Sequence, residues 1–173
     1  MKKLAVLVAA LLVAAPAFAG NTGIVKLSLW GNIAVALPNN IHNITGVDVG
    51  IGSAADTVTG VQWDFIHNET NTVKGVQTAW IWNNADTVYG VQSAIVSINE
   101  NKLMGVQGGW INLANGEVIG AQLGLYNQVA DLHGLQLGFV NYAKHISKGL
   151  QIGLLNIAKN GWLPAMIIVN GRF

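Results

Sequence analysis

The sequence predicts an all-β protein, and the fold we expect first is an antiparallel, transmembrane-type β-barrel of about ten strands. Three observations point to it: a unit of 14 or 15 residues recurs along most of the chain, polar and apolar residues alternate within the units, and only 10% of residues are charged. A fixed repeat period is considered first because it sets the architecture. The units begin at Gly46, Gly60, Gly75, Gly90, Gly105, Gly120, Gly134 and Gly149.

Alternation with a period of two residues predicts strands. In 88–96, Val88, Gly90, Gln92, Ala94 and Val96 share one face, and the residues between them share the other. Glycine in every unit and many β-branched residues argue against helices. The expected strands are Ile24–Leu37, Asn43–Ser53, Thr57–His67, Thr72–Trp82, Thr87–Ile98, Lys102–Asn112, Glu117–Asn127, Asp131–Asn141, Ile146–Asn156 and Ala165–Phe173.

Short polar clusters separate these strands. Asn, Asp and Gly tolerate turn dihedrals and bond their own backbone, so we expect turns at these clusters. They are 68–71, 83–86, 99–101 and 115–116.

Two architectures use a unit of this length. In a β-solenoid each unit is one coil, whereas in a barrel each unit is one strand of about 9–11 residues and its turn. The unit is nearly palindromic about its glutamine, because Gly90 and Ala94 flank Gln92 and Val88 and Val96 lie beyond them. Such a strand presents a similar profile in either direction, which suits antiparallel neighbours. We therefore expect the barrel, with a β-solenoid of one repeat per coil as the alternative.

The N-terminus has the pattern of a secretory signal over residues 1–19, followed by one β-repeat domain over 20–173. Lys2 and Lys3 precede an apolar run, and Ala17-Phe18-Ala19 forms a cleavage site before Gly20. An uncleaved anchor is the alternative, although the run is short for a spanning helix. The expected location is the outer membrane or the cell surface.

Composition excludes several functions. The chain has nine basic and eight acidic residues and no basic patch, so we expect no nucleic-acid partner. It contains no cysteine, which excludes disulfides and thiol nucleophiles. The histidines lack metal-ligand spacing. We therefore expect no enzyme activity, no catalytic residues, no metal and no cofactor.

Polar residues of the glutamine-bearing face are the candidate site. In a barrel they would point into the lumen, either as a narrow solute path or as groups that satisfy one another's hydrogen bonds. The expected lumen-facing residues are Lys26, Asp48, Asp64, Gln62, Gln77, Gln92, Gln107, Gln122, Gln136, Gln151 and Arg172.

The opposite face is apolar and rich in aromatic residues. Trp80, Trp82, Trp110 and Trp162 suit the aromatic girdle of a membrane interface, and core packing in a solenoid is the alternative. Outer-membrane lipid is the expected partner, and no protein partner or solute is indicated.

The unit G-[VL]-Q-x-G-x-x-N-x-A, clearest at 134–143 and 149–158, resembles that of the short-repeat surface proteins of leptospires and other bacteria. The resemblance implies export and surface display but no defined activity. Curli-type amyloid repeats are more weakly similar, with longer and less apolar units. We thus expect an outer-membrane or surface barrel with a structural or surface-interaction role, or alternatively a surface-displayed solenoid that serves as a binding or assembly module.

Overall fold

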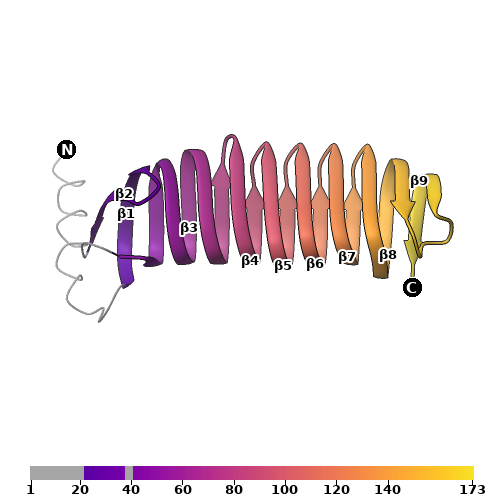
Figure 1. The fold of residues 1–173 in the computed structure, drawn as a ribbon, viewed down its shortest axis with the longest axis horizontal. Coiled ribbons are helices and arrows are strands. Elements are labelled where there is room, and N and C mark those ends of the chain that lie inside the picture. Colours follow the sequence, from indigo (N-terminus) through magenta and orange to yellow (C-terminus); the bar gives the residue numbers. More distant parts are fainter. Residues whose placement is uncertain (1–21, 38–40) are drawn as a thin grey trace, which may run out of the picture.

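The computed structural model describes residues 22–37 and 41–173, and these residues form a β-solenoid. Successive turns of the chain stack side by side along one long axis, from β1 at one end to β9 at the other (Figure 1). Within the described residues, no helix is long and apolar enough to cross a membrane. The predicted signal lies outside these residues.

A single sheet of nine strands follows the order β2-β1-β3-β4-β5-β6-β7-β8-β9. Strand β1 pairs in parallel with β3, and each strand from β3 to β8 pairs in parallel with the next. Antiparallel strands cover both ends, β2 on β1 and β9 on β8. The strands are β1 Thr22–Trp30, β2 Ile33–Leu37, β3 Asn43–Ala79, β4 Trp82–Ser93, β5 Val96–Gly108, β6 Ile111–Leu123, β7 Tyr126–Leu137, β8 Val140–Ala158 and β9 Ala165–Arg172.

The prediction of an antiparallel barrel is wrong, and the alternative β-solenoid is confirmed. Each residue pairs with its equivalent one repeat later, for example Gly90 with Gly105 and Gln92 with Gln107. The near-palindrome of the repeat did not discriminate between the two folds, because it describes side chains and not the direction of the chain. The terminal strand β9 likewise covers the end of a stack and does not close a barrel.

The interior of the solenoid is built from columns of equivalent residues. One column is aliphatic and fully buried, and a second contains mainly small side chains. Parallel in-register stacking brings like side chains together in each column. The aliphatic column comprises Ile44, Val58, Val73, Val88, Leu103, Val118, Leu132 and Ile146. The small column comprises Thr70, Ala85, Asn99, Ala114, Val129, Ala143 and Ala158.

Seven buried glutamines form a continuous ladder through the interior. Six of the seven side-chain amides donate to the glutamine of the preceding coil, as from Gln107 Nε2 to Gln92 Oε1 at 3.1 Å, and Gln62 donates to Asp48 instead. In the five coils from Gln92 to Gln151 the amide also donates to a backbone carbonyl across the coil, as from Gln122 Nε2 to Gln128 O at 3.1 Å. The buried amides are therefore paired, which removes most of the cost of burying them.

An asparagine ladder runs along the other side of the interior. Asn127 Nδ2 donates to Asn141 Oδ1 at 2.8 Å and to Leu137 O at 3.0 Å. The column comprises Asn68, Asn83, Ser97, Asn112, Asn127, Asn141 and Asn156, all buried. Their side chains form hydrogen bonds to the backbone next to the corners of the coils. These corners lie at 80–81, 94–95, 109–110, 124–125 and 138–139.

The predicted turns at the four polar clusters are wrong, because all four clusters lie within strands β3 to β6. β3 runs without interruption through 68–71, where Asn68 and Thr70 point inward and are buried. Asn68 Nδ2 donates to Asn83 Oδ1 in the next coil. Thr70 Oγ1 accepts from Gln77 Nε2 in the next coil and donates across its own coil to Gln62 Oε1. The predicted strand Ile24–Leu37 is also two strands, because a turn at Gly31, with φ of 55°, folds β2 back onto β1.

The leading glycine of each repeat is required by its neighbour in the adjacent coil and, at every repeat except that of Gly149, by its backbone conformation as well. Gly105 has φ of 141°, which L-residues rarely adopt. A Cβ at Gly105 would overlap the carbonyl oxygen of Gly90 in the coil below. The coils can therefore stack at the spacing of a β-sheet only if this column lacks side chains.

We expect Gly105→Ala to destabilise the protein by at least about 3 kcal/mol, because backbone strain of this kind costs about 1–3 kcal/mol before any steric overlap. The matched control is Gly108→Ala in the same coil, where a Cβ meets only Ser93 Oγ at 3.8 Å. That change should alter stability by less than about 1 kcal/mol. Urea-unfolding midpoints followed by circular dichroism measure both, and equal midpoints for the two variants would contradict the role of the glycine column.

We expect Gln107→Leu, in the middle of the ladder, to cost about 1–3 kcal/mol more than Gln151→Leu at its last position. The first change removes bonds to Gln92 and Gln122, whereas Gln151 bonds to only one ladder neighbour, Gln136. The measurement is again the unfolding midpoint. Equal decreases in midpoint for the two variants would show that the hydrogen bonds of the ladder add no stability beyond the packing of the side chains.

Candidate interaction surface

One side of the solenoid is apolar along its whole length. We define the apolar face as the outward-pointing residues of eight equivalent segments: 47–51, 61–65, 76–80, 91–95, 106–110, 121–125, 135–139 and 150–154. The paired strands place these segments side by side, so Thr78, Ser93, Gly108, Leu123 and Leu137 form one column across the face.

The most exposed column of the apolar face lies at the corner of each coil. Its large side chains are between 41% and 65% exposed, far more than a packed residue. It comprises Phe65, Trp80, Ile95, Trp110, Leu125, Phe139 and Leu154. None of the outward residues of the face is charged, and only Thr78 and Ser93 are polar. Contiguous apolar surface of this extent is rare on a soluble monomer and marks an interaction site.

Two grooves lie near the C-terminal end of the solenoid, the first on the apolar face and the second at its border, where His133 and Lys148 also line it. The first, of about 530 Å³, follows Gly124, Gly138 and Gly153 between flanking apolar side chains and ends at Ile168. The second, of about 550 Å³, follows Gly134 and Gly149 and ends at Phe173. Ile168 itself has φ of 69°, an unusual and strained conformation for a β-branched residue.

Aromatic rings gather at the opposite, N-terminal end. The His67 ring lies between two tryptophan rings, with centroids 4.8 Å from Trp30 and 5.9 Å from Trp82. Phe65 and Trp80 pack beside each other at 5.4 Å. All six tryptophans of the chain are exposed, by 37% to 63%. The structure therefore places tryptophan on the outside of the coil and not in its core.

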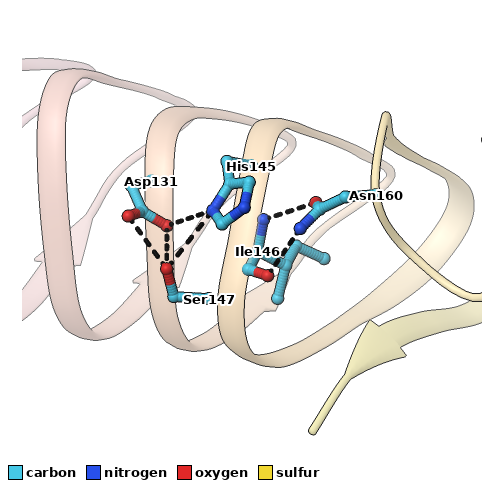
Figure 2. Close-up of polar contacts among 5 residues, drawn as sticks. All are labelled: Asp131, His145, Ile146, Ser147 and Asn160. Carbon is cyan, nitrogen blue, oxygen red and sulfur yellow. Dashed lines mark hydrogen bonds and ion pairs between the residues drawn. The ribbon is translucent and has the colours of Figure 1, made fainter.

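Among the described residues, Asp131, His145 and Ser147 form a side-chain cluster that resembles a catalytic arrangement (Figure 2). The Asp131 carboxylate and the Ser147 hydroxyl both lie near the same ring nitrogen, His145 Nδ1, at 3.1 and 3.2 Å. Ser147 also donates to both oxygens of Asp131. A nucleophile–base relay needs the serine and the carboxylate on different ring nitrogens. This geometry provides no such relay.

The same cluster lies on the surface of the solenoid. Partial burial acts to raise the pKa of Asp131, but the hydrogen bonds from His145 and Ser147 outweigh it, so this pKa lies below its usual value. Asn160, in the turn after β8, brackets the backbone of Ile146 with bonds of 2.7 and 2.9 Å (Figure 2). The Asn160 side chain thus replaces the backbone hydrogen-bond partners that a further coil would have given Ile146.

The structure places most of the residues predicted to line a lumen inside the coil. All seven ladder glutamines, Lys26, Asp48 and Asp64 are buried, and their side chains fill the interior. Arg172 is exposed and does not join them. The charged residues gather at the N-terminal end of the glutamine ladder, where Gln62 Nε2 donates to Asp48 at 3.2 Å.

Asp48 terminates the ladder because a carboxylate only accepts hydrogen bonds. It also accepts from Ser28 at 2.8 Å and from Ser53. Lys26 Nζ donates to Ser53 Oγ at 3.1 Å. Burial lowers the pKa of Lys26, and the charges of Asp48 and Asp64 act against this shift.

Asp64 is the anomalous member of this cluster. It is fully buried, and neither carboxylate oxygen has a hydrogen-bond partner among the described residues. Burial and the charge of Asp48 raise the pKa of Asp64 to about 7, although Lys26 acts to lower it. The uncharged form of Asp64 is therefore favoured inside the solenoid over most of the acidic range.

The comparisons and the metal-ligand geometry suggest no known activity. Comparison with protein-family models, with curated proteins and with solved structures finds no match. In the part of the chain that the structure describes, no group of three or more His, Cys, Asp or Glu side chains is placed to hold a metal ion.

Sequence reasoning missed three features of this surface. The grooves, the ring stack around His67 and the Asp131 cluster all join residues from different coils. Only the parallel one-repeat register brings them together, and that register was not the one expected. A stricter comparison of equivalent residues would have aligned Gly124, Gly138 and Gly153 in one column.

We expect Asp64→Asn to stabilise the protein at pH 8 and to leave its stability near pH 4 almost unchanged. The carboxyl of Asp64 has a raised pKa in the folded state, about 7, against about 4 when unfolded. The folded state therefore binds more protons, and wild-type stability falls as pH rises from about 4 through 7. Asp64→Asn removes the ionisable group and with it this pH dependence. The free energy of unfolding of the variant should therefore exceed that of wild type by on the order of 3 kcal/mol at pH 8.

Urea midpoints of wild type and Asp64→Asn between pH 4 and 8 measure the effect. Asp86→Asn is the control, because Asp86 is exposed and its variant should keep the wild-type slope. Parallel pH profiles for wild type and Asp64→Asn would contradict the account of the buried carboxyl.

Proposed function

We propose that this protein is an exported β-solenoid, displayed at the cell surface, that serves as a binding or assembly module. The observation that carries the proposal is the apolar face, whose corner column alone exposes seven large side chains in line. A rigid rod with such a face is suited to hold a partner along its length. The secretory pattern of residues 1–19 and the resemblance to short-repeat surface proteins support the exported location.

A non-enzymatic role is part of the proposal. It is supported by the geometry at His145, where serine and carboxylate share one ring nitrogen. Outer-membrane lipid, the partner expected from the sequence, stays a prediction for the same face. Three of the six exposed tryptophans, Trp63, Trp80 and Trp110, lie on this face and support it, since tryptophan favours membrane interfaces.

Expression of the full chain in a Gram-negative host tests the location. We expect cleavage after Ala19, a mature chain that begins at Gly20, and protease accessibility on intact cells. Ala19→Tyr, which places a large residue at the cleavage site, should accumulate uncleaved. N-terminal sequencing and protease treatment of whole cells give the readout, and an uncleaved wild-type chain confined to the cytosol would overturn the proposal of export.

A further inference from the structure

The apolar face has the size and shape of one side of a protein interface. Three outward positions in each of eight coils give a face of about 24 residues, and a standard interface contributes about 20–30 residues per side. With coils about 4.8 Å apart, its columns extend for about 34 Å. The face is therefore large enough for a stable dimer without help from other surfaces.

The charge distribution favours a protein partner over a lipid surface. The outward residues of the face include no Lys or Arg, and the exposed pair Lys102–Glu117, at 2.8 Å, lies outside its segments. Surface-bound amphipathic segments generally add basic residues that attract anionic lipid. The chain has a formal net charge of only +1, so two copies would repel each other weakly.

The periodicity of the face points to a second copy of this chain. Neighbouring residues of each column are separated by the distance between hydrogen-bonded strands, about 4.8 Å. Only a partner whose own side chains repeat at this distance can contact the face in the same way at every coil. Ridges and grooves also lie side by side on it. The exposed row of Leu125, Phe139 and Leu154 borders the groove over Gly124, Gly138 and Gly153.

We infer that the apolar face is the interface of a two-fold dimer, in which the ridge of each copy enters the groove of the other. A two-fold axis makes the contact isologous, so the same patch serves both copies and the assembly closes at two. The inference rests on the proposed function as an assembly module and names its partner. It does not depend on where the protein is located in the cell.

The test uses protein recovered from cells that express the full chain, in buffer without detergent. Sedimentation equilibrium should give about twice the mass of one protomer. Leu123→Glu should weaken the dimer at least about 100-fold, because it buries an unpaired charge on each side of the interface. Leu123 is 40% exposed, and its column already contains Thr78 and Ser93, so the fold should tolerate a polar residue there.

The matched control is Leu113→Glu, an outward leucine on another side of the coil whose column includes Gln128. It should leave the dimer intact. Circular dichroism checks that both variants keep their β-structure. A wild-type monomer at 100 micromolar, or equal weakening by the two variants, would overturn the inference. A wild-type monomer that floats with phosphatidylcholine vesicles would overturn it in favour of lipid.

Cross-linking gives a second measurement that does not depend on a disruptive variant. The chain has no cysteine, so Ser93→Cys and Ser97→Cys each introduce a single thiol. Ser93 lies on the face and Ser97 is buried in the interior. A bismaleimide that spans about 10 Å, the distance between packed sheets, should link Ser93→Cys into dimers. Failure to link it, or equal linkage of Ser97→Cys, would overturn the inference.

Failure of this inference can be distinguished from failure of the proposed location. Mass and cross-linking are measured on purified protein, whereas cleavage at Ala19 and surface accessibility are measured in cells. A processed, surface-exposed monomer would overturn the dimer alone. An unprocessed dimer would overturn the export proposal and leave the interface standing.

Discussion

The close approach of the backbone at the glycine column is the constraint on which the rest of the structure depends. Each leading glycine from Gly60 to Gly149 lies directly over the carbonyl of the glycine one coil earlier, and all of these except Gly149 have a positive φ that L-residues rarely adopt. This contact fixes the register of neighbouring coils at one repeat. Once that register is fixed, Gln107 must stack on Gln92 and Leu103 on Val88. The hydrogen-bonded ladders and the aliphatic column follow from the same register.

The corners of the coils show how sequence variation is accommodated without losing the asparagine ladder. Where the corner residue is Gly109, Gly124, Gly138 or Gly153, the ladder asparagine follows three residues later. A Cβ at Gly124 would contact Asn112 Nδ2 and the carbonyl oxygen of Gly109. Where the corner is Ala94 the ladder residue shrinks to Ser97, and where it is Ala79 one extra residue delays Asn83. A larger corner residue is thus accompanied by either a smaller ladder residue or a longer spacing.

The sequence predicted the β class, the repeat and the inward position of Gln92, because period-two alternation depends only on the local backbone. It did not decide the direction of neighbouring strands, which depends on contacts between coils. Asn68 and Asn83 were assigned to turns because asparagine usually bonds its own backbone. Here their amides bond along the stack instead, at 2.8 Å. The apolar face was recognised as apolar, but the grooves of that face required the one-repeat register.

The ends of the solenoid explain why association should be lateral. A parallel stack with bare ends could add further copies indefinitely, as in a cross-β fibre. Here β2 and β9 cover the two ends as antiparallel strands, which do not continue the one-repeat parallel register. Asp48 ends the glutamine ladder with a group that cannot donate further, and Asn160 occupies the backbone of Ile146. The apolar face stays uncovered. A closed dimer that forms through this face would bury it, and no further copies would need to add to the ends of the solenoid.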